Sequence, residues 1–549
     1  MLLFFFMKIF NFFSLLFSLL LSSEVFSQNV LVEMQATPAI TRYDAAGNLY
    51  VVGRSERNGS IGATNLPSYG ATDVFLAKFG FGSTLLWVKV LGGTGDDDAS
   101  YLGFTPNGNI DIAFNSSKIL DLDPGTGTVN TPQDSTSNVV TFDPNGNYVS
   151  SKTFGYNGWV TAIQYSGTTV NYIGNFSGRF DADYSTGISL LTQPTTASDP
   201  GFFAHYENNT LVYASIFDGK ITGFNTDYAG DLLLTLQVRK PFDADFRLGT
   251  TNTITPPTTN YHPCLMRVKT DGSLVWAKVL GTQLTSDDYM TLMLSSKPNN
   301  GNNIVIGSTY RYGGDIDPSP TNTVNISSTY SFGSFVAVFN SNGDLVGSKN
   351  FNKGVNVMGG IIPGNQGESL IHGFFVDTMV LSPSVQLTHR GKTGSFGGFA
   401  SVLSSNFTPS PTSQFYYGNG ADSRMFVGDR YDQIGFSRYA LPGVAADTCD
   451  FDLTSSSRGQ VINKGFIIEP VILTSNENVS NDNYSFVYPN PANDWLNLNF
   501  EPVGAATIVN ILGQKQAATL VDGKIQISTL EKGIYWLTVD GSSFKFIKE

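Results

Sequence analysis

The residues best suited to chemistry are aspartates that stand two positions apart in short repeated phrases. The clearest pairs are Asp121 with Asp123 and Asp315 with Asp317, and the phrase returns at residues 181–183, 243–245 and 450–452. Two carboxylates at this spacing on a loop can both reach a hard cation such as Ca²⁺, which takes about six to eight oxygen ligands. Neither pair brings the remaining ligands of a complete calcium loop, and Asp before Pro or Gly is also common in turns. The sequence therefore leaves two interpretations open: calcium binding at these four residues, or one turn repeated along the chain.

Catalytic motifs are scarce. The four histidines form no H-E-x-x-H motif, and neither a G-x-S-x-G elbow nor a G-x-x-x-x-G-K loop occurs. His205 follows an apolar run on an expected strand, which favours a structural role. Carboxylates about 5–10 Å apart can hydrolyse glycosides, but the sequence does not show which carboxylates face each other. The acidic run at residues 96–98 is typical of a solvated turn. Because none of these features marks a catalytic site, we expect no catalytic residues and no organic cofactor.

Composition points to an all-β fold. Charged residues make up 14% of the 549 residues, and there are 57 glycines and 41 phenylalanines. Gly-rich turns between aromatic and β-branched segments are typical of many short strands. The net charge of −13 repels a phosphate backbone, which argues against nucleic acid as a partner.

The middle of the chain is built from a repeated phrase. A strand ending near Gly53, a second strand over residues 73–79 and a third over residues 85–92 return as residues 302–307, 334–339 and 342–346. The segment Trp-x-Lys-Val-Leu-Gly occurs twice, beginning at Trp87 and at Trp276. Repeated tryptophans on a strand are more often core residues than sugar-stacking platforms. With a further strand leading into the next unit, each repeat predicts four strands, which is one blade of a β-propeller.

These phrases resemble the SBBP-type β-propeller repeats of secreted bacterial proteins, over about residues 29–473. The spacing of about 60 to 70 residues predicts about seven blades, although six or eight remain open. Because the last repeat lacks a final strand, we expect the N-terminal segment 30–34 to join it and close the ring. The resemblance implies no defined activity.

The N-terminus reads as an export signal. Residues 1–21 are almost wholly apolar with Lys8 as the only cation, and the chain then turns polar up to a small-residue context at Ser27. We expect cleavage between Ser27 and Gln28. A retained membrane anchor is the alternative, and initiation at Met7 rather than Met1 is left open. No transmembrane segment is expected after signal removal.

The C-terminal segment carries several short motifs in series after a polar linker at residues 474–483. Alternating apolar residues and Gly turns over residues 484–549 predict a small β-sandwich. The motifs closely resemble the type A sorting domain of the type IX secretion system, found in Bacteroidota. The matching residues are Tyr488, Pro489, Asn490, Pro491, Asp494, Gly513, Gly533, Tyr535 and Lys548. The resemblance implies interaction with the type IX machinery, passage across the outer membrane, and release or surface attachment.

The sequence thus predicts a signal peptide (residues 1–27), an all-β propeller of about seven four-stranded blades (28–473), a linker (474–483) and a sorting β-sandwich (484–549). We expect a secreted or surface-displayed, non-enzymatic binding or adhesion protein, with glycans or surface proteins as partners. Two alternatives remain open: a polysaccharide-active glycosidase or lyase that uses carboxylates in the propeller channel, and a structural component of the envelope.

Overall fold

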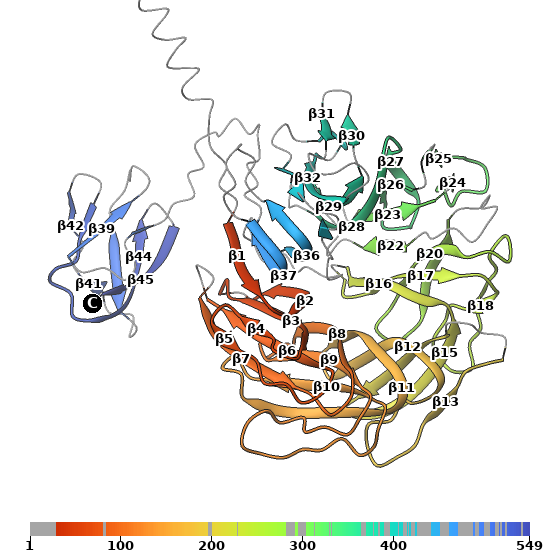
Figure 1. Ribbon diagram of the computed structural model, residues 1–549, viewed down its shortest axis with the longest axis horizontal. Helices are drawn as coiled ribbons and strands as arrows, with labels where there is room; N and C mark the ends of the chain where they lie inside the picture. The colour runs from red at the N-terminus through yellow and green to blue at the C-terminus, as the bar shows by residue number, and fades with distance from the viewer. Residues whose placement is uncertain are drawn as a thin grey trace, which may run out of the picture. The chain divides into compact units, whose positions relative to one another are not determined.

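A computed structural model gives the arrangement of the chain (Figure 1). It describes residues 29–44, 46–80, 84–195, 200–227, 229–280, 291–294, 303–311, 313–328, 330, 332–363, 369–376, 378–382, 385–388, 396–404, 406–409, 414–415, 417–418, 423–424, 441–450, 460–469, 487–488, 494–498, 506–510, 515–516, 519–521, 524–539 and 542–548. Every helix or strand within these ranges is a β-strand, which confirms the all-β prediction. Within these ranges the chain has no helix of the length and apolarity needed to span a membrane.

The chain divides into two compact units between Leu473 and Thr474. In the first unit, the strands pair in chain order into antiparallel sheets. The first sheet has the order β2 (Thr37–Tyr43), β3 (Leu49–Glu56), β6 (Thr72–Phe79) and β7 (Leu85–Leu91). The connection from β3 to β6 contains β4 (Ser60–Ile61) and β5 (Thr64–Asn65).

The next eight strands form one continuous sheet, which curls strongly in Figure 1. Its path runs β8 (Asp97–Phe104), β9 (Ile110–Ser116), β10 (Thr136–Phe142), β11 (Tyr148–Ser166), β12 (Thr169–Asp181), β14 (Pro200–Glu207) and β15 (Thr210–Asp218), with β13 (Leu190–Thr192) on β12. The sheet is continuous because β11 is long enough to serve two sets of four strands. Its first half pairs with β10, and its second half, from Gly155 to Ser166, pairs with β12.

Three further four-stranded sheets follow. They are β16 (Lys220–Thr226), β17 (Leu232–Val238), β20 (His262–Val268) and β21 (Leu274–Val279); β22 (Thr291–Leu294), β23 (Ile304–Tyr310), β26 (Gly333–Phe339) and β27 (Leu345–Phe351); and β28 (Val355–Pro363), β29 (Ser369–Val376), β32 (Phe396–Leu403) and β33 (Gln414–Phe415). Two-stranded ribbons form in their long connections. These are β18 (Phe242–Asp243) with β19 (Thr253–Ile254), β24 (Gly313–Asp315) with β25 (Asn325–Ser327), and β30 (Thr378–Ser382) with β31 (Val385–Thr388).

The last sheet of the first unit joins the two ends of that unit. Its order is β34 (Tyr417–Gly418), β36 (Leu441–Asp450), β37 (Gln460–Glu469) and β1 (Asn29–Met34), with β35 (Ser423–Arg424) on β36 and the β4–β5 hairpin beyond β1. β1 runs antiparallel to β37, from the pair of Asn29 with Glu469 to that of Met34 with Gly465. The N-terminal strand therefore completes the last sheet, as the sequence predicted.

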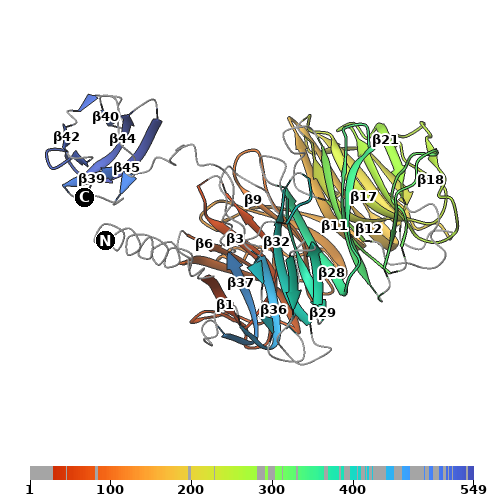
Figure 2. The ribbon, with the colours of Figure 1, turned by 90° about the horizontal axis from the view of Figure 1, so that it is seen from above.

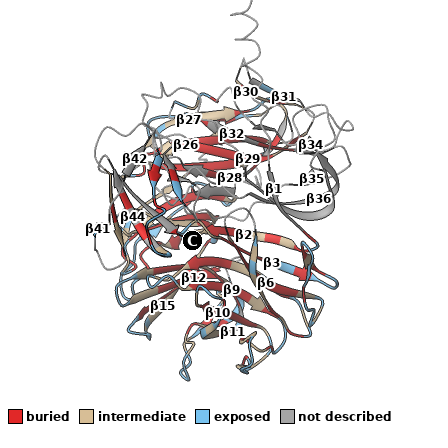
Figure 3. Cartoon of the chain, turned by 90° about the vertical axis from the view of Figure 1, so that its left-hand side faces the viewer, coloured by how far each residue is buried: buried red, intermediate tan, exposed pale blue. Residues whose placement is uncertain are grey.

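Strands of successive sheets, together with the long strand β11 inside the eight-stranded sheet, lie against one another. β2 contacts β8, β8 contacts β11, β11 contacts β16, β16 contacts β22 and β22 contacts β28, while β2 also contacts β36 of the last sheet. Figure 2 shows the strands of the first unit from above, and Figure 3 shows buried residues along strands such as β9, β12, β26 and β29.

A recurring Gly within the second strand of a four-stranded set has a packing reason. Gly53 on β3 faces Phe75 on β6, and Gly174 on β12 faces Phe202 on β14. A Cβ on either glycine would lie 2.8 Å from the phenylalanine ring, which is too close for two carbons. Glycine thus lets the buried aromatic ring of the third strand lie directly on the backbone of the second.

The second unit is two four-stranded sheets over one core. One sheet has the order β38 (Val487–Tyr488), β39 (Trp495–Leu498), β43 (Lys524–Gln526) and β42 (Thr519–Val521); the other has β41 (Lys515–Gln516), β40 (Thr507–Asn510), β44 (Gly533–Val539) and β45 (Ser542–Lys548). Leu496 and Ile525 from the first sheet pack with Ile508 and Leu537 from the second. This is the small β-sandwich that the sequence predicted.

Candidate functional site

The D-x-D phrases fold into loops that share one hydrogen-bond pattern. The Oδ1 atom of Asp121 accepts from the backbone N–H of Asp123 (3.0 Å) and of Val129 (2.7 Å), which closes the loop. The Oδ1 atom of Asp315 does the same for Asp317 (3.0 Å) and Val324 (2.8 Å). Asp181 and Asp243 repeat these contacts in the connections after β12 and β17.

The second aspartate of each phrase makes a shorter turn. Asp123 accepts from Gly125 N–H (2.8 Å), and Asp317 accepts from Ser319 N–H (2.9 Å). These bonds satisfy backbone donors in long loops, so they account for the recurrence of the phrase. The four residues do not come together, because each pair belongs to a different connection. Across the described residues, no group of three or more His, Cys, Asp or Glu side chains is placed to hold a metal ion. Calcium binding at Asp121, Asp123, Asp315 and Asp317 stays a prediction.

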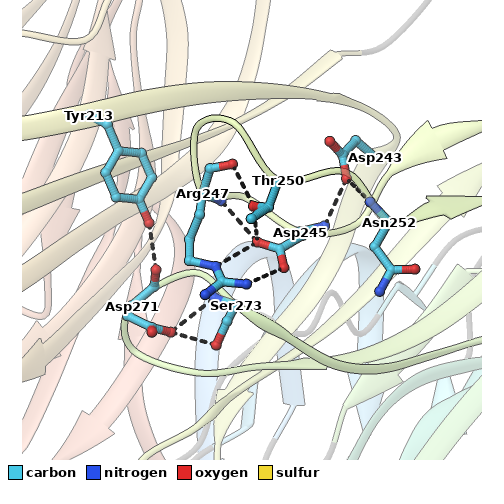
Figure 4. A network of polar contacts seen from close by, with 8 residues as sticks. All are labelled: Tyr213, Asp243, Asp245, Arg247, Thr250, Asn252, Asp271 and Ser273. Atoms are coloured by element: carbon cyan, nitrogen blue, oxygen red, sulfur yellow. Dashed lines mark hydrogen bonds and ion pairs between the residues drawn. The ribbon is translucent and has the colours of Figure 1, made fainter.

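In the loop at residues 243–252, an arginine side chain pairs with the second aspartate of the phrase (Figure 4). Arg247 forms two hydrogen bonds to the carboxylate of Asp245, 2.9 Å from Nε to Oδ1 and 2.8 Å from Nη2 to Oδ2. Hydrogen bonding from Arg247 lowers the pKa of Asp245 to about 2. In this repeat the guanidinium group occupies both carboxylate oxygens, and Thr250 donates to the same Oδ1 at 3.0 Å.

A polar pocket lies among the contacting strands of the first three sheets. It has a volume of about 240 Å³ and is lined by Arg42, Tyr101, Leu102, Gly103, Phe104, Ile163, Gln164, Tyr165, Phe224, Asn225 and Thr226. These residues come from β2, β8, β11 and β16, which are successive in the contact order. We call this the inner-strand pocket. No sequence motif marks it, because its wall is assembled from four segments spread over residues 42–226.

Arg42 brings a positive charge to the inner-strand pocket. Its side chain is only 7% exposed, and its Nε–H donates to the carbonyl oxygen of Leu102 at 3.3 Å. None of the residues that line the pocket is Asp or Glu. A guanidinium group in such a setting suits a carboxylate or another anion, which it can contact through two parallel hydrogen bonds.

Tyr165 links the pocket to a buried carboxylate. Its hydroxyl donates to Oδ2 of Asp111 on β9, and Thr141 on β10 donates to Oδ1 at 2.6 Å. Burial raises the pKa of the Asp111 carboxyl, while the hydrogen bonds from Thr141 and Tyr165 oppose that shift. Burial, and then the charge of Asp111, raise the pKa of the Tyr165 phenol. Tyr165 is therefore a fixed, neutral phenol in the pocket wall.

A second polar chain fixes Gln164. Its Nε2 donates to the carbonyl oxygen of Gly230 (2.6 Å), and its Oε1 accepts from Nδ2 of Asn171 (2.9 Å). Asn171 Oδ1 lies 2.7 Å from Nδ1 of His205, whose side chain is 5% exposed. Since His205 reaches the pocket only through Asn171 and Gln164, its contacts agree with the structural role expected from the sequence.

One sequence prediction is wrong, and others concern residues outside the described ranges. The expectation of a solvated turn at residues 96–98 is wrong for Asp97, which is fully buried, although Asp96 and Asp98 are exposed. Ser27 and Gln28, and with them the expected cleavage site, lie outside the described residues, as do Pro489, Asn490, Pro491 and Gly513.

The described sorting residues belong to the second unit. Tyr488 ends β38, Gly533 begins β44 and Lys548 ends β45. Asp494 accepts through its backbone carbonyl from Ile527 N–H at 2.8 Å, and the Tyr535 hydroxyl donates to the carbonyl oxygen of Glu531 at 2.9 Å. The last two contacts fix loops around the sandwich core.

The family described as the secretion system C-terminal sorting domain matches residues 486–549. The chain therefore ends in a type IX secretion sorting domain. Such a domain indicates secretion to the cell surface or outside the cell and implies interaction with the type IX secretion machinery. No curated protein matches the chain.

Solved structures show only distant likeness. An acylaminoacyl peptidase in complex with a chloromethyl ketone is 9% identical with a TM-score of 0.31, over 75% of this chain and 58% of the peptidase. The chain thus spans less than two thirds of that enzyme. The Synechocystis apocarotenoid oxygenase is 8% identical with a TM-score of 0.30, over 71% of this chain and 91% of the oxygenase. PorZ, a surface component of the type IX secretion system of Porphyromonas gingivalis, is 9% identical with a TM-score of 0.20, over 94% of this chain and 82% of PorZ.

Proposed function

We propose that this is an exported, non-enzymatic binding protein whose first unit is a β-propeller of about seven blades with the SBBP type of repeat. Support for the propeller comes from the succession of four-stranded antiparallel sheets and from β1, which completes the last sheet beside β37. Support for the export comes from the sorting domain at residues 486–549. The mature binding unit would span about residues 28–473, between signal peptide and linker.

The single observation behind the binding role is the inner-strand pocket with its buried Arg42. Tyr101, Tyr165 and Phe224 give the pocket aromatic walls beside the guanidinium group. Typical small-molecule sites begin near ~300 Å³, so a pocket of about 240 Å³ accepts one ring or side group of a larger ligand. An acidic sugar residue of a surface polysaccharide combines a ring that packs on aromatic walls with a carboxylate that pairs with arginine.

The pocket favours binding over hydrolysis. Glycosidases commonly use two carboxyl groups that flank the scissile bond. Asp and Glu are absent from the residues that line this pocket. Asp111, the carboxylate behind it, is fully buried and occupied by Tyr165 and Thr141. The arrangement therefore has a group that can attract an acidic sugar but no acid–base pair in contact with it.

The test is retention of the full chain on insoluble acidic and neutral polysaccharides, with and without calcium, together with an assay for new reducing ends. We expect retention on acidic polysaccharide that salt weakens, and no product. Arg42→Gln should lose retention, whereas Arg179→Gln, which changes an exposed arginine on β12, should keep it. Arg42→Lys should retain part of it and serves if Arg42→Gln fails to fold. New reducing ends, or equal retention of Arg42→Gln and the unaltered chain, would overturn the proposal.

A further inference from the structure

The strands that contact one another from sheet to sheet share one irregularity. Each of β2, β8, β11, β16 and β28 has a shift in register, typical of a β-bulge, at an equivalent place in its pairing with the next strand. The shifts fall at residues 38–40, 99–101, 160–162, 221–223 and 358–360. A bulge changes the direction of nearby side chains and is common next to active sites. The residue before each bulge therefore occupies the same position on each strand.

Trp159 occupies this position on β11. Its side chain is 42% exposed, whereas that of the next residue, Val160, is fully buried. The residues at the same position on the neighbouring strands are Asp98 on β8 and Lys220 on β16, and both are exposed. The position thus presents to solvent a large aromatic ring on the strand between an acidic and a basic residue.

A hydrogen bond between β8 and β11 places Asp98 and Trp159 at one level. The hydroxyl of Ser100, in the bulge of β8, donates to the carbonyl oxygen of Val160 at 2.7 Å. Partial burial raises the pKa of the Asp98 carboxyl, and the charge of Arg54 on β3 opposes this shift. The acidic side of the position therefore also lies near a guanidinium group.

Asn175 fixes the basic side of the position. It is the residue of β12 that pairs with Trp159. Its Oδ1 accepts from the backbone N–H of Ile221 at 3.1 Å, and its Nδ2 donates to the carbonyl oxygen of Gly219 at 3.3 Å. These two bonds hold the backbone on either side of Lys220, so Lys220 lies level with the pair of Trp159 and Asn175.

This position is separate from the inner-strand pocket on the same strands. The pocket is lined by residues that follow the bulges, at 101–104 on β8, 163–165 on β11 and 224–226 on β16. Trp159 precedes its bulge and is roughly 15 Å along the strand from Gln164, at ~3.3 Å per residue. Two sites at this separation suit different sugar units of one extended chain.

We infer that Trp159, with Asp98 and Lys220 on either side, is a second subsite that binds a pyranose ring of a polysaccharide. One face of such a ring carries C–H groups that pack on the electron-rich face of an indole. Its hydroxyls can donate to the carboxylate of Asp98 and accept from the ammonium group of Lys220. The inference rests on the proposed polysaccharide binding and extends it, because Trp159 recognises the ring whereas Arg42 recognises the acidic group. Two subsites also favour a polymer over a single sugar.

The test measures binding of the full chain to two soluble polysaccharides by isothermal calorimetry at low and high salt. Alginate is acidic and engages both subsites, whereas dextran is neutral and engages the Trp159 subsite alone. Trp159→Ala should weaken the binding of both by about threefold to tenfold, and equally at both salt concentrations. Trp159→Phe keeps an aromatic face and should retain most of the affinity. Trp495→Ala changes a tryptophan of β39 that is 39% exposed and is the matched control.

The outcomes separate the two subsites. Arg42→Gln should weaken alginate binding and its salt dependence and leave dextran binding unchanged. If only Trp159→Ala weakens binding, the Trp159 subsite stands and the role of Arg42 falls. The inference is overturned if the chain does not bind dextran, or if Trp159→Ala binds both polymers as the unaltered chain does. Should Trp159→Ala fail to fold, Lys220→Gln, at an exposed residue, replaces it and should also weaken dextran binding.

Discussion

The indole N–H of Trp276 on β21 donates to the backbone carbonyl of Ser341, 2.9 Å away in the turn between β26 and β27 of the next sheet. The same contact occurs two sheets earlier along the chain, where Trp87 on β7 donates to the carbonyl of Pro144 at 3.3 Å. In both places the indole lies on a turn glycine with positive φ, Gly343 or Gly146. The repeated tryptophan therefore links two neighbouring sheets through a hydrogen bond and a packing contact.

The variant Gly343→Ala tests the packing contact between Gly343 and the indole of Trp276. A Cβ at Gly343 would come within 2.9 Å of the Trp276 ring, at a φ of +77°. Gly108→Ala is the matched control, because Gly108 has a φ of +79° in an equivalent turn and nothing within 4 Å. Both variants pay the left-handed backbone cost, roughly 1–2 kcal/mol. Overpacking against the indole should cost Gly343→Ala about 1–3 kcal/mol more of the free energy of unfolding in urea. Equal losses would mean that the indole yields without cost.

The sequence predicted the repeat but assigned this tryptophan only to the core. Periodicity and turn residues are local, so they located strands and turns. The joining of β1 to β37 was predicted differently, from the strand that the last repeat lacks. The partner of Trp276 lies 65 residues away, and only the stacking of sheets brings it near. Asp97 was misread for the same reason: its acidic neighbours suggested solvent, whereas its burial comes from contacts with the Thr72–Asp73 segment.

Asp315→Ala should destabilise the chain, because it removes the acceptor for the N–H groups of Asp317 and Val324. Leaving buried backbone donors unsatisfied costs about 1–3 kcal/mol. Asp315→Asn keeps an oxygen at this position and should retain most of the stability. The comparison, made by urea unfolding with and without calcium, also tests the calcium interpretation of the D-x-D loops. Calcium-dependent stability that Asp315→Asn abolishes would favour a metal site, whereas calcium-independent curves would favour a repeated turn.

The stability of the chain should depend on Asp97 in a defined pH window. Its carboxyl has a pKa of about 7 in the folded protein against 3.8 in its ordinary state. The folded state therefore holds a proton that the unfolded state releases, so this contribution is full below about pH 4 and is lost as the pH rises to about 7. Asp73 and Asp96, which face Asp97, shift the window in the same direction. Urea unfolding between pH 4 and 8 in chelator should show this fall, and Asp97→Asn should remove it.

His372 should produce the opposite dependence. Burial lowers the pKa of its ring to about 3, from 6.5. The folded state keeps this ring neutral while the unfolded state takes up a proton, so stability is present above about pH 6.5 and is lost as the pH falls towards 3. Since this ring lies on β29, far along the chain from Asp97, His372→Gln should flatten the acid limb and leave the Asp97 window intact. A variant that alters both limbs would show that the fold itself has changed.

Removal of residues 474–549 should block export without unfolding the first unit. The second unit has its own core, in which Leu496, Ile508, Ile525 and Leu537 are fully buried, and the chain divides between Leu473 and Thr474. The truncated chain should accumulate inside the outer membrane of a producing cell, whereas the full chain reaches the surface or the medium. Fractionation with immunodetection measures this. Lys524→Ala, which changes an exposed side chain on β43 outside the sorting motif, is the control and should still be exported. Appearance of the truncated chain outside the cell in normal amounts would show that the first unit carries its own export signal.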